Sequence, residues 1–323
     1  MARVALLSNP RSTGNRSLLP RVRSFCAAHK DIFHYEVEHV DQIGAALRTI
    51  AMVKPKVLVI NGGDGTVQAT LTEIHNGGHF GDSPPPVAVL PNGKTNLIAQ
   101  DLGAVGDPLG ALEKVLELAR SDLDPHIVRR ELIALSGGTE DGLPVLGMFL
   151  GGALLADTML YCRHKLYPRF PNPVAHALAL MLGLLAVVIG RFARYVPQRK
   201  MPLRVSFTRN GELRGHFAVL MVTTLQRVLF GTHMPGEGQR TGAMQLIVIE
   251  RSLGALLGAL IAAIRGRLGR GRLRGVHLER GDEIRIEGEH SSVILDGELF
   301  EADCGRPIVL KPTAPVTFLR LAA

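Results

Sequence analysis

The chain is poor in cysteine. Its 323 residues include only Cys26, Cys162 and Cys304, which lie far apart and form no Cys-x-x-Cys pair. Disulfide frameworks and structural zinc sites need cysteines that recur at short spacings. The twelve histidines form no His-Glu-x-x-His or other ligand spacing either. We therefore expect reduced thiols in a cytosolic protein, without a zinc site.

Aromatic residues are also scarce, with no tryptophan and four tyrosines, although the formal net charge is +8. That charge predicts a polyanionic partner. Residues 264–275 hold five arginines and no aromatic residue. Since single-stranded nucleic acid is bound by stacking bases on aromatic side chains, no nucleic-acid partner is expected. An anionic membrane surface suits this segment better, and a solvated basic loop is the alternative.

Long hydrophobic runs are missing as well. The longest, residues 174–190, contains His176 and is at the short limit for a membrane span. We expect it to form a buried or interfacial helix, with a span as the less favoured alternative. The apolar run in MARVALLSNP is too short for a signal peptide and predicts a first strand.

What is present suffices for two folded domains. Hydrophobic residues make up 46% and charged residues 20% of the chain. Residues 1–150 hold 14 Lys and Arg against 16 Asp and Glu, whereas residues 151–323 hold 23 against 13. The C-terminal half therefore carries the whole positive excess.

Strand and helix patterns alternate in the first third of the chain and then give way to short β-like stretches. Alternation predicts an α/β domain with a mostly parallel sheet, which we place at residues 1–125. Residues 126–323 are predicted to form a β-rich, sandwich-like domain with helical insertions at residues 174–190 and 253–264. The expected elements of the first domain are strands at residues 4–8, 33–37, 56–61 and 87–90, and helices at residues 18–29, 42–53, 66–75, 95–101 and 109–119.

The strongest motif is Gly-Gly-Asp-Gly-Thr at residues 62–66, where a strand meets the start of a helix. Glycines let the backbone approach a ligand, and a helix N-terminus favours negative charge. The motif predicts a phosphate cradle. The alternative is a tight turn in which Asp64 caps the helix.

Residues 88–95, AVLPNGKT, fit a relaxed Walker A loop and follow the next strand. A Walker A loop usually follows the first strand, and this match begins with Ala88 and includes Pro91. We therefore interpret it as a second phosphate loop. Two such loops at the carboxyl ends of one sheet predict a single nucleotide site.

Two weaker motifs remain. Asn9 and Ser12 lie in a polar loop after the first strand, where a plain turn is the alternative. Asp296-Gly297-Glu298 near the C-terminus brings two carboxylates together, one of which would accept a proton from a hydroxyl. A hairpin turn with exposed acids is the alternative reading of this motif.

In their order along the chain, from Asn9 to Glu298, the four motifs resemble those of the diacylglycerol kinase and sphingosine kinase family, and the chain resembles a bacterial-type lipid kinase. The third motif reads Pro91-Asn-Gly93-Lys-Thr95-Asn96-Leu-Ile-Ala99-Gln-Asp-Leu102-Gly103. The resemblance implies an NAD-kinase-like N-terminal domain, use of ATP and Mg²⁺, and a last strand that returns to the first domain. It implies phosphorylation of a lipid hydroxyl of the diacylglycerol, ceramide or sphingoid type. It also implies a cytoplasmic protein, peripheral at the inner membrane surface.

The resemblance also implies roles for residues. Asp296 would be the general base, and Asp157, in the segment at residues 147–157, would meet the lipid headgroup. A helix-capping or salt-bridged aspartate is the alternative for Asp157. Lys94 stands where the family usually has Ser or Thr, and we expect it to contact phosphate. The nucleotide would be bound by Asn9, Ser12, Gly62, Gly63, Asp64, Gly65, Thr66, Gly93, Lys94, Thr95, Asn96 and Glu298.

The chain departs from the family pattern in other places. After Val67, Gln68-Ala69 stands where the family commonly has Asn-Glu, and Thr224-Leu225 and Thr241-Gly242 replace Asn-Gly and Asp-Gly. The metal ligands are therefore left unassigned. The oligomeric state, including a homo-oligomer, stays open. Three other functions stay open too: a soluble NAD kinase-like enzyme, a P-loop NTPase and a catalytically silent lipid-binding module.

Overall fold

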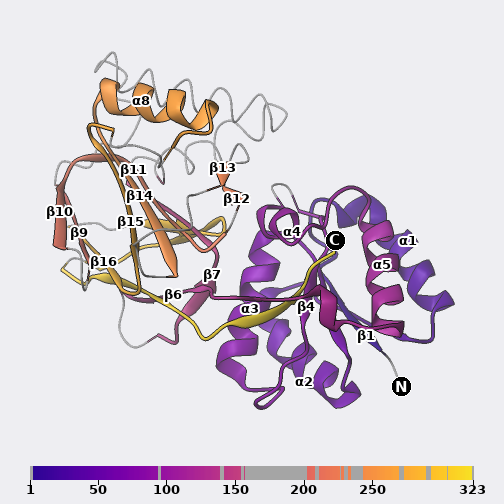
Figure 1. The fold of residues 1–323 in the computed structure, drawn as a ribbon. Coiled ribbons are helices and arrows are strands. Elements are labelled where there is room, and N and C mark those ends of the chain that lie inside the picture. Colours follow the sequence, from indigo (N-terminus) through magenta and orange to yellow (C-terminus); the bar gives the residue numbers. More distant parts are fainter. Residues whose placement is uncertain are drawn as a thin grey trace. The chain divides into compact units, whose positions relative to one another are not determined.

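The computed structural model describes two compact units (Figure 1). The N-terminal unit comprises Met1–Leu132, Leu143–Gly147 and Thr313–Ala323, and the C-terminal unit comprises Ile133–Gly142 and Met148–Pro312. The sequence-based boundary after residue 125 falls in a short 3-10 helix, η2 (Asp124–His126). The structure describes residues 3–93, 96–138, 142–153, 156, 202–207, 211–225, 227–228, 232–233, 243–268, 273–288, 292–303 and 305–321, so the run at residues 174–190 lies outside them.

The N-terminal unit is built on a six-stranded sheet with strand order β2-β1-β3-β4-β20-β5. The first four strands of that order are parallel, and β20 runs parallel to β4. This confirms the predicted α/β fold with a parallel sheet. Its strands are β1 (Val4–Ser8), β2 (Ile32–Glu36), β3 (Val57–Asn61), β4 (Val87–Val89), β5 (Ile127–Arg130) and β20 (Val316–Leu319). Its helices are α1 (Asn15–Ala28), η1 (Val40–Gln42), α2 (Ile43–Val53), α3 (Asp64–Gly77), α4 (Leu97–Asp101) and α5 (Pro108–Arg120).

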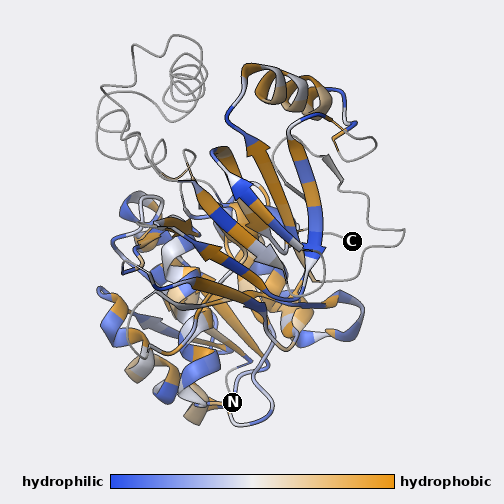
Figure 2. Cartoon of the chain, turned by 90° about the vertical axis from the view of Figure 1, so that its left-hand side faces the viewer, coloured by the Kyte–Doolittle hydropathy of each residue, from blue (hydrophilic) through white to orange (hydrophobic). Residues whose placement is uncertain are grey.

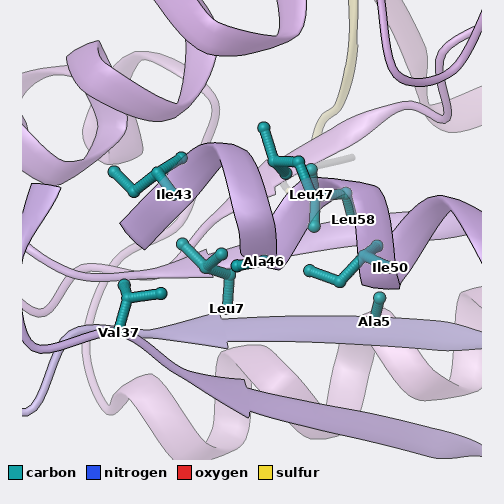
Figure 3. Close-up of a cluster of buried hydrophobic side chains, with 8 residues drawn as sticks. All are labelled: Ala5, Leu7, Val37, Ile43, Ala46, Leu47, Ile50 and Leu58. Carbon is teal, nitrogen blue, oxygen red and sulfur yellow. The ribbon is translucent and has the colours of Figure 1, made fainter. Parts of the chain in front are cut away.

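Strands β1 and β3 are central, because each has a neighbouring strand on both sides. Every residue in them is buried. Helix α2 covers one face of the sheet with residues spaced three and four apart, which lie on one side of a helix. This spacing explains why α2 forms where the sequence predicted it. Figure 3 shows the resulting cluster, which contains Ala5, Leu7, Val37, Ile43, Ala46, Leu47, Ile50 and Leu58.

The last strand, β20, comes from the far end of the chain. Its Phe318 is fully buried and pairs with Val87 of β4 on one side and Val128 of β5 on the other. Strand β7 (Val145–Gly147) also belongs to this unit, where the Leu146 N–H donates to the Thr72 Oγ1 of α3 at 3.0 Å. The N-terminal unit is thus assembled from three separate stretches of chain.

The C-terminal unit is rich in antiparallel strands, as predicted. One sheet contains the neighbours β10-β9-β16-β19-β6, another has the order β15-β14-β11-β8-β17-β18, and β12 pairs with β13. The strands are β6 (Ile133–Gly137), β8 (Phe149–Gly152), β9 (Leu203–Phe207), β10 (Gly211–Gly215), β11 (Phe217–Thr223), β12 (Arg227–Val228), β13 (Thr232–His233), β14 (Met244–Glu250), β15 (Val276–Gly281), β16 (Ile284–Glu287), β17 (Val293–Leu295), β18 (Glu298–Phe300) and β19 (Ile308–Pro312).

One helix, α8 (Leu253–Ile264), packs on strands of the second of these sheets. Its bounds agree with the helix predicted at residues 253–264. Among the described residues, none of the helices has both the length and the apolar character needed to cross a membrane.

Candidate nucleotide-binding site

Three loops follow β1, β3 and β4, which are neighbours in the N-terminal sheet. Because these strands are parallel, their carboxyl ends lie at one edge, where ligands of open α/β sheets bind. The loops hold most of the nucleotide-site residues that the sequence predicted. The structure therefore brings the first three motifs together.

Side chains of the first loop hold the glycine-rich second loop. The Gly63 N–H donates to the Ser12 Oγ at 3.1 Å, and the Asn9 Nδ2 donates to the Thr66 Oγ1 at 2.9 Å. Gly62 packs so closely on Thr66 that an added Cβ would lie 2.6 Å from the threonine Cβ. Glycine is needed at this position because no side chain fits.

The second and third loops touch through their backbones. A Cβ on Gly93 would lie 2.9 Å from the Cα of Gly63, so a side chain would force the loops apart. Asn96 adopts a left-handed conformation (φ 55°), and its Oδ1 accepts the Gly93 N–H at 2.6 Å. The backbone N–H of Asn96 also donates to the Asp64 carboxylate. Two loops whose contacting glycines, Gly63 and Gly93, lie 30 positions apart in the sequence thereby form one surface.

Beneath the loops lies a buried network of asparagines that the sequence analysis missed. The Asn92 Nδ2 donates to the Oδ1 of Asn61 at 2.7 Å and to that of Asn15. The Asn61 Nδ2 donates to the Ser8 Oγ at 3.0 Å, which joins the end of β3 to that of β1. The available signal was that β3 ends on Asn61 and that the loop after β4 contains Asn92, whereas nothing in the sequence marked Asn15.

Helix α3 begins at Asp64, and its N-cap, Gly63, provides no side-chain cap. Backbone N–H groups of the first helical turn, such as those of Asp64 and Gly65, are therefore the donors that this end offers to an anion. Burial raises the pKa of the Asp64 carboxyl, and the Asn96 N–H partly offsets this effect. Because the ionised Asp64 carboxylate is poorly solvated, a cation that binds together with a phosphate ligand would stabilise its charged form.

The remaining positions concern the third loop and the residues that follow Gly-Gly-Asp-Gly-Thr in α3. Lys94 and Thr95 lie outside the described residues. Gln68 is buried in α3, and Ala69 packs against the cluster of Figure 3. Where the family commonly has an acid, this chain therefore packs a methyl group on its core.

The late carboxylates lie in the C-terminal unit, at the turn between β17 and β18. Asp296 (φ 47°) and Gly297 (φ 96°) both have positive φ angles, as a type I′ turn requires. The Asp296 Oδ2 and Oδ1 accept the N–H groups of Met148 and Phe149, each at 2.9 Å. Asp296 is buried and Glu298 is exposed. The turn thus fixes Asp296 and presents Glu298 to solvent.

The carbonyl of Met148 links this turn to Thr224, one of the departures from the family pattern. It accepts the Thr224 N–H at 3.0 Å and the Thr223 hydroxyl at 2.9 Å. Asp157 and Thr241-Gly242 lie outside the described residues. Within the described part of the chain, no group of three or more His, Cys, Asp or Glu side chains is arranged to hold a metal ion.

Residues 3–126 match the family model of the diacylglycerol kinase catalytic domain. The matched residues include the three loops that follow β1, β3 and β4, which together we call the cradle. They confirm the resemblance that the motifs indicated. The family assignment supports a kinase. No curated protein matches the chain.

Solved structures show the same fold over nearly the whole length. A diacylglycerol kinase from Bacillus anthracis str. Sterne aligns over 98% of this chain and 96% of its own, at 15% identity and a TM-score of 0.61. A further structure from that organism aligns with the same coverage at 18% identity and a TM-score of 0.63. An NAD kinase from Archaeoglobus fulgidus in complex with ATP aligns over 98% of this chain and 93% of its own, at 12% identity and a TM-score of 0.50. These alignments confirm the predicted NAD-kinase-like fold.

Proposed function

We propose that the protein is an ATP-dependent lipid kinase that phosphorylates the hydroxyl group of a membrane lipid of the diacylglycerol, ceramide or sphingoid type. The observation that carries the proposal is the three-loop cradle within a diacylglycerol kinase catalytic domain. A lipid acceptor implies a peripheral location at the inner membrane surface.

In this proposal the cradle binds the phosphates of ATP. The backbone N–H groups of Asp64 and Gly65, at the start of α3, would donate to the phosphate oxygens, with Lys94 as a further positive contact. Asp64 is the carboxylate of the cradle that would hold Mg²⁺ bound with the nucleotide, because such ions need only one or two protein carboxylates. Magnesium would offset the negative charge of the triphosphate.

The proposed general base is Asp296. The lipid O–H proton passes to its carboxylate while the lipid oxygen bonds to the γ-phosphorus and the bond to the β-phosphate oxygen breaks, releasing ADP. Each carboxylate oxygen accepts one backbone N–H, which holds the carboxylate in a fixed orientation. Glu298 is proposed to lie beside the nucleotide, and Asp157 to meet the lipid headgroup.

The test is transfer from labelled ATP to a panel of lipids in mixed micelles, with NAD as a soluble acceptor. We expect one lipid class to be labelled by the wild type. Asp296→Asn should lower transfer by about 100-fold or more. The substitution also places an NH₂ group against a backbone N–H donor, so thermal unfolding and ATP binding must be measured beside it.

Glu298→Gln is the matched variant, because Glu298 is exposed and its replacement should leave the fold intact. If Asp296→Asn binds ATP and keeps most of its transfer, Asp296 is not the base. Labelling of NAD in place of every lipid would establish a soluble kinase instead. Bound ATP without transfer to any acceptor would establish a silent binding module.

A further inference from the structure

Helix α8 carries large apolar side chains on the side that faces solvent. Leu253, Leu257, Ile261 and Ile264 are 38%, 47%, 46% and 69% exposed. At the helical advance of about 100° per residue, they fall within about 80° of one another. Figure 2 shows hydrophobic colouring along this helix. The four side chains therefore form one continuous stripe, which we call the α8 stripe.

The opposite side of α8 docks on the sheet through two alanines and Leu256. Ala255 and Ala259 are buried against Ile247, Ile249 and Val276. A Cβ on Gly275 would lie 2.9 Å from that of Ala255, so the helix lies close to the backbone beneath it. A helix that served only to cover a sheet would turn its largest apolar residues inward. This one turns four of its six leucine and isoleucine side chains outward.

The two ends of α8 are well defined. The Ser252 Oγ accepts the Ala255 N–H at 3.2 Å and caps the N-terminus. At the other end Gly266 has φ 61°, and the Arg267 N–H donates to the Ala262 carbonyl at 2.8 Å, the pattern of a Schellman cap. The chain therefore leaves the helix at a fixed point, immediately beside the stripe.

The residues that follow the C-terminal end of α8 carry positive charge. Arg265 and Arg267 are exposed, and within the described residues neither forms an ion pair. Three more arginines follow in the sequence up to residue 274. Apolar side chains next to uncompensated arginines complement a surface of anionic lipid, in which acyl chains lie beneath phosphates. A second copy of the chain would bring the same positive charge instead.

We propose that α8 docks this protein on an anionic phospholipid bilayer, with the α8 stripe in the headgroup–acyl boundary and Arg265 and Arg267 on lipid phosphates. A 12-residue helix is about 18 Å long, too short to span the bilayer, so it lies in the plane of the surface. The inference rests on the proposed function in one respect, because a kinase of a membrane lipid must reach the bilayer.

Vesicle sedimentation without ATP tests the docking, using phosphatidylglycerol mixed with phosphatidylcholine and phosphatidylcholine alone as probes. Leu257→Gln with Ile261→Gln should weaken binding about tenfold or more. Arg265→Gln with Arg267→Gln should remove much of the anionic preference, roughly fivefold per arginine. The matched control is Met52→Gln with Val105→Gln, which removes two side chains 81% and 71% exposed on the N-terminal unit and should change nothing.

A fluorescence reporter tests the contact directly. The chain has no tryptophan, so Ile261→Trp places a single one in the α8 stripe. Its emission should shift to the blue and be quenched by brominated phosphatidylglycerol vesicles, whereas that of Met52→Trp should not. No vesicle binding, equal binding by the glutamine variants, or a blue shift that needs protein concentration and no lipid would each overturn the proposal.

Transfer to micellar acceptors is measured separately. Vesicle binding without transfer would support membrane docking by α8 and contradict the proposed kinase activity. Transfer without vesicle binding would support the kinase activity and contradict the docking.

Discussion

At the scale of single residues, the cradle depends on positions where only glycine fits. Gly14 has an ordinary backbone conformation (φ −72°), but an added Cβ would lie 1.8 Å from the Asn92 Oδ1. Gly14→Ala should therefore displace Asn92 from the buried network and cost about 1–3 kcal/mol in the free energy of unfolding. Chemical denaturation measures this loss.

Gly110→Ala is the matched control. Gly110 lies in α5, where an added Cβ meets nothing within 4 Å. Alanine should stabilise the helix by up to about 1 kcal/mol. If Gly14→Ala and Gly110→Ala changed the free energy of unfolding alike, the close packing of Gly14 on Asn92 would not contribute to stability.

Asp64 predicts a pH dependence of stability. Its pKa is raised in the folded protein because the carboxylate is buried, so the unfolded chain loses the proton first as the pH rises. Ionisation of Asp64 therefore costs stability above its usual pKa, and the cost is complete above the folded pKa. Asp64→Asn, whose amide oxygen still accepts the Asn96 N–H, should be more stable than the wild type at pH 7. This gain should vanish on acidification below the usual pKa of the carboxyl. Thermal unfolding of the nucleotide-free proteins across pH measures it, and a gain that grows toward acid would contradict the assignment.

At the scale of elements, the asparagine network holds three strand ends together. Asn92→Ala would leave the Oδ1 atoms of Asn15 and Asn61 buried without their donor. We expect a loss of about 2 kcal/mol or more, together with weaker ATP binding. Denaturation and calorimetric titration of ATP measure the two effects.

The comparison for Asn92→Ala is Asn76→Ala, which breaks one partly buried hydrogen bond to the Pro144 carbonyl. Its cost should be about 1 kcal/mol, and its ATP affinity should be unchanged. An Asn92→Ala variant that was equally mild would show that the network does not position the loops.

Element patterns were predictable where the period of hydrophobicity was clear. Strand β1 and helix α8 have the expected bounds, and α2 begins one residue later than predicted. The sequence does not predict strands such as β8 and β15, because Phe-Leu-Gly-Gly and Val-His-Leu-Glu-Arg-Gly lack a strong β-pattern. Their places are set by pairing with β11 and β14, which local sequence does not encode.

The candidate site was predictable in part for a related reason. Glycine-rich loops after strands can be read locally, because the backbone conformation demands those residues. The hydrogen bonds of Asn15, Asn61 and Asn92 join positions up to 77 residues apart, so no local pattern reveals them. The two N–H donors to Asp296 come from residues almost 150 positions earlier.

At the scale of the whole molecule, the N-terminal unit depends on the end of the chain. A fragment of residues 1–147 lacks β20 and so exposes the edge of β4 and leaves the place of Phe318 empty. We expect this fragment to show no cooperative thermal transition. The same fragment with residues 313–321 joined by a flexible linker should melt cooperatively and bind ATP.

Circular dichroism and calorimetry distinguish the two fragments. Cooperative melting and ATP binding by residues 1–147 alone would show that β20 is dispensable. The outcome matters because the matched catalytic domain ends at residue 126, before β20 begins.

The position of β20 also fixes an order of events during synthesis. The ribosome makes residues 1–132 before the C-terminal unit, yet their sheet lacks the strand between β4 and β5 until Val316–Leu319 have left the exit tunnel. The C-terminal unit ends at Pro312, so all of its chain emerges earlier. Domains usually fold in the order of their translation. In this protein the N-terminal unit emerges first, but its sheet is completed only after the chain of the C-terminal unit has emerged, so the edges of β4 and β5 that face β20 stay exposed until then.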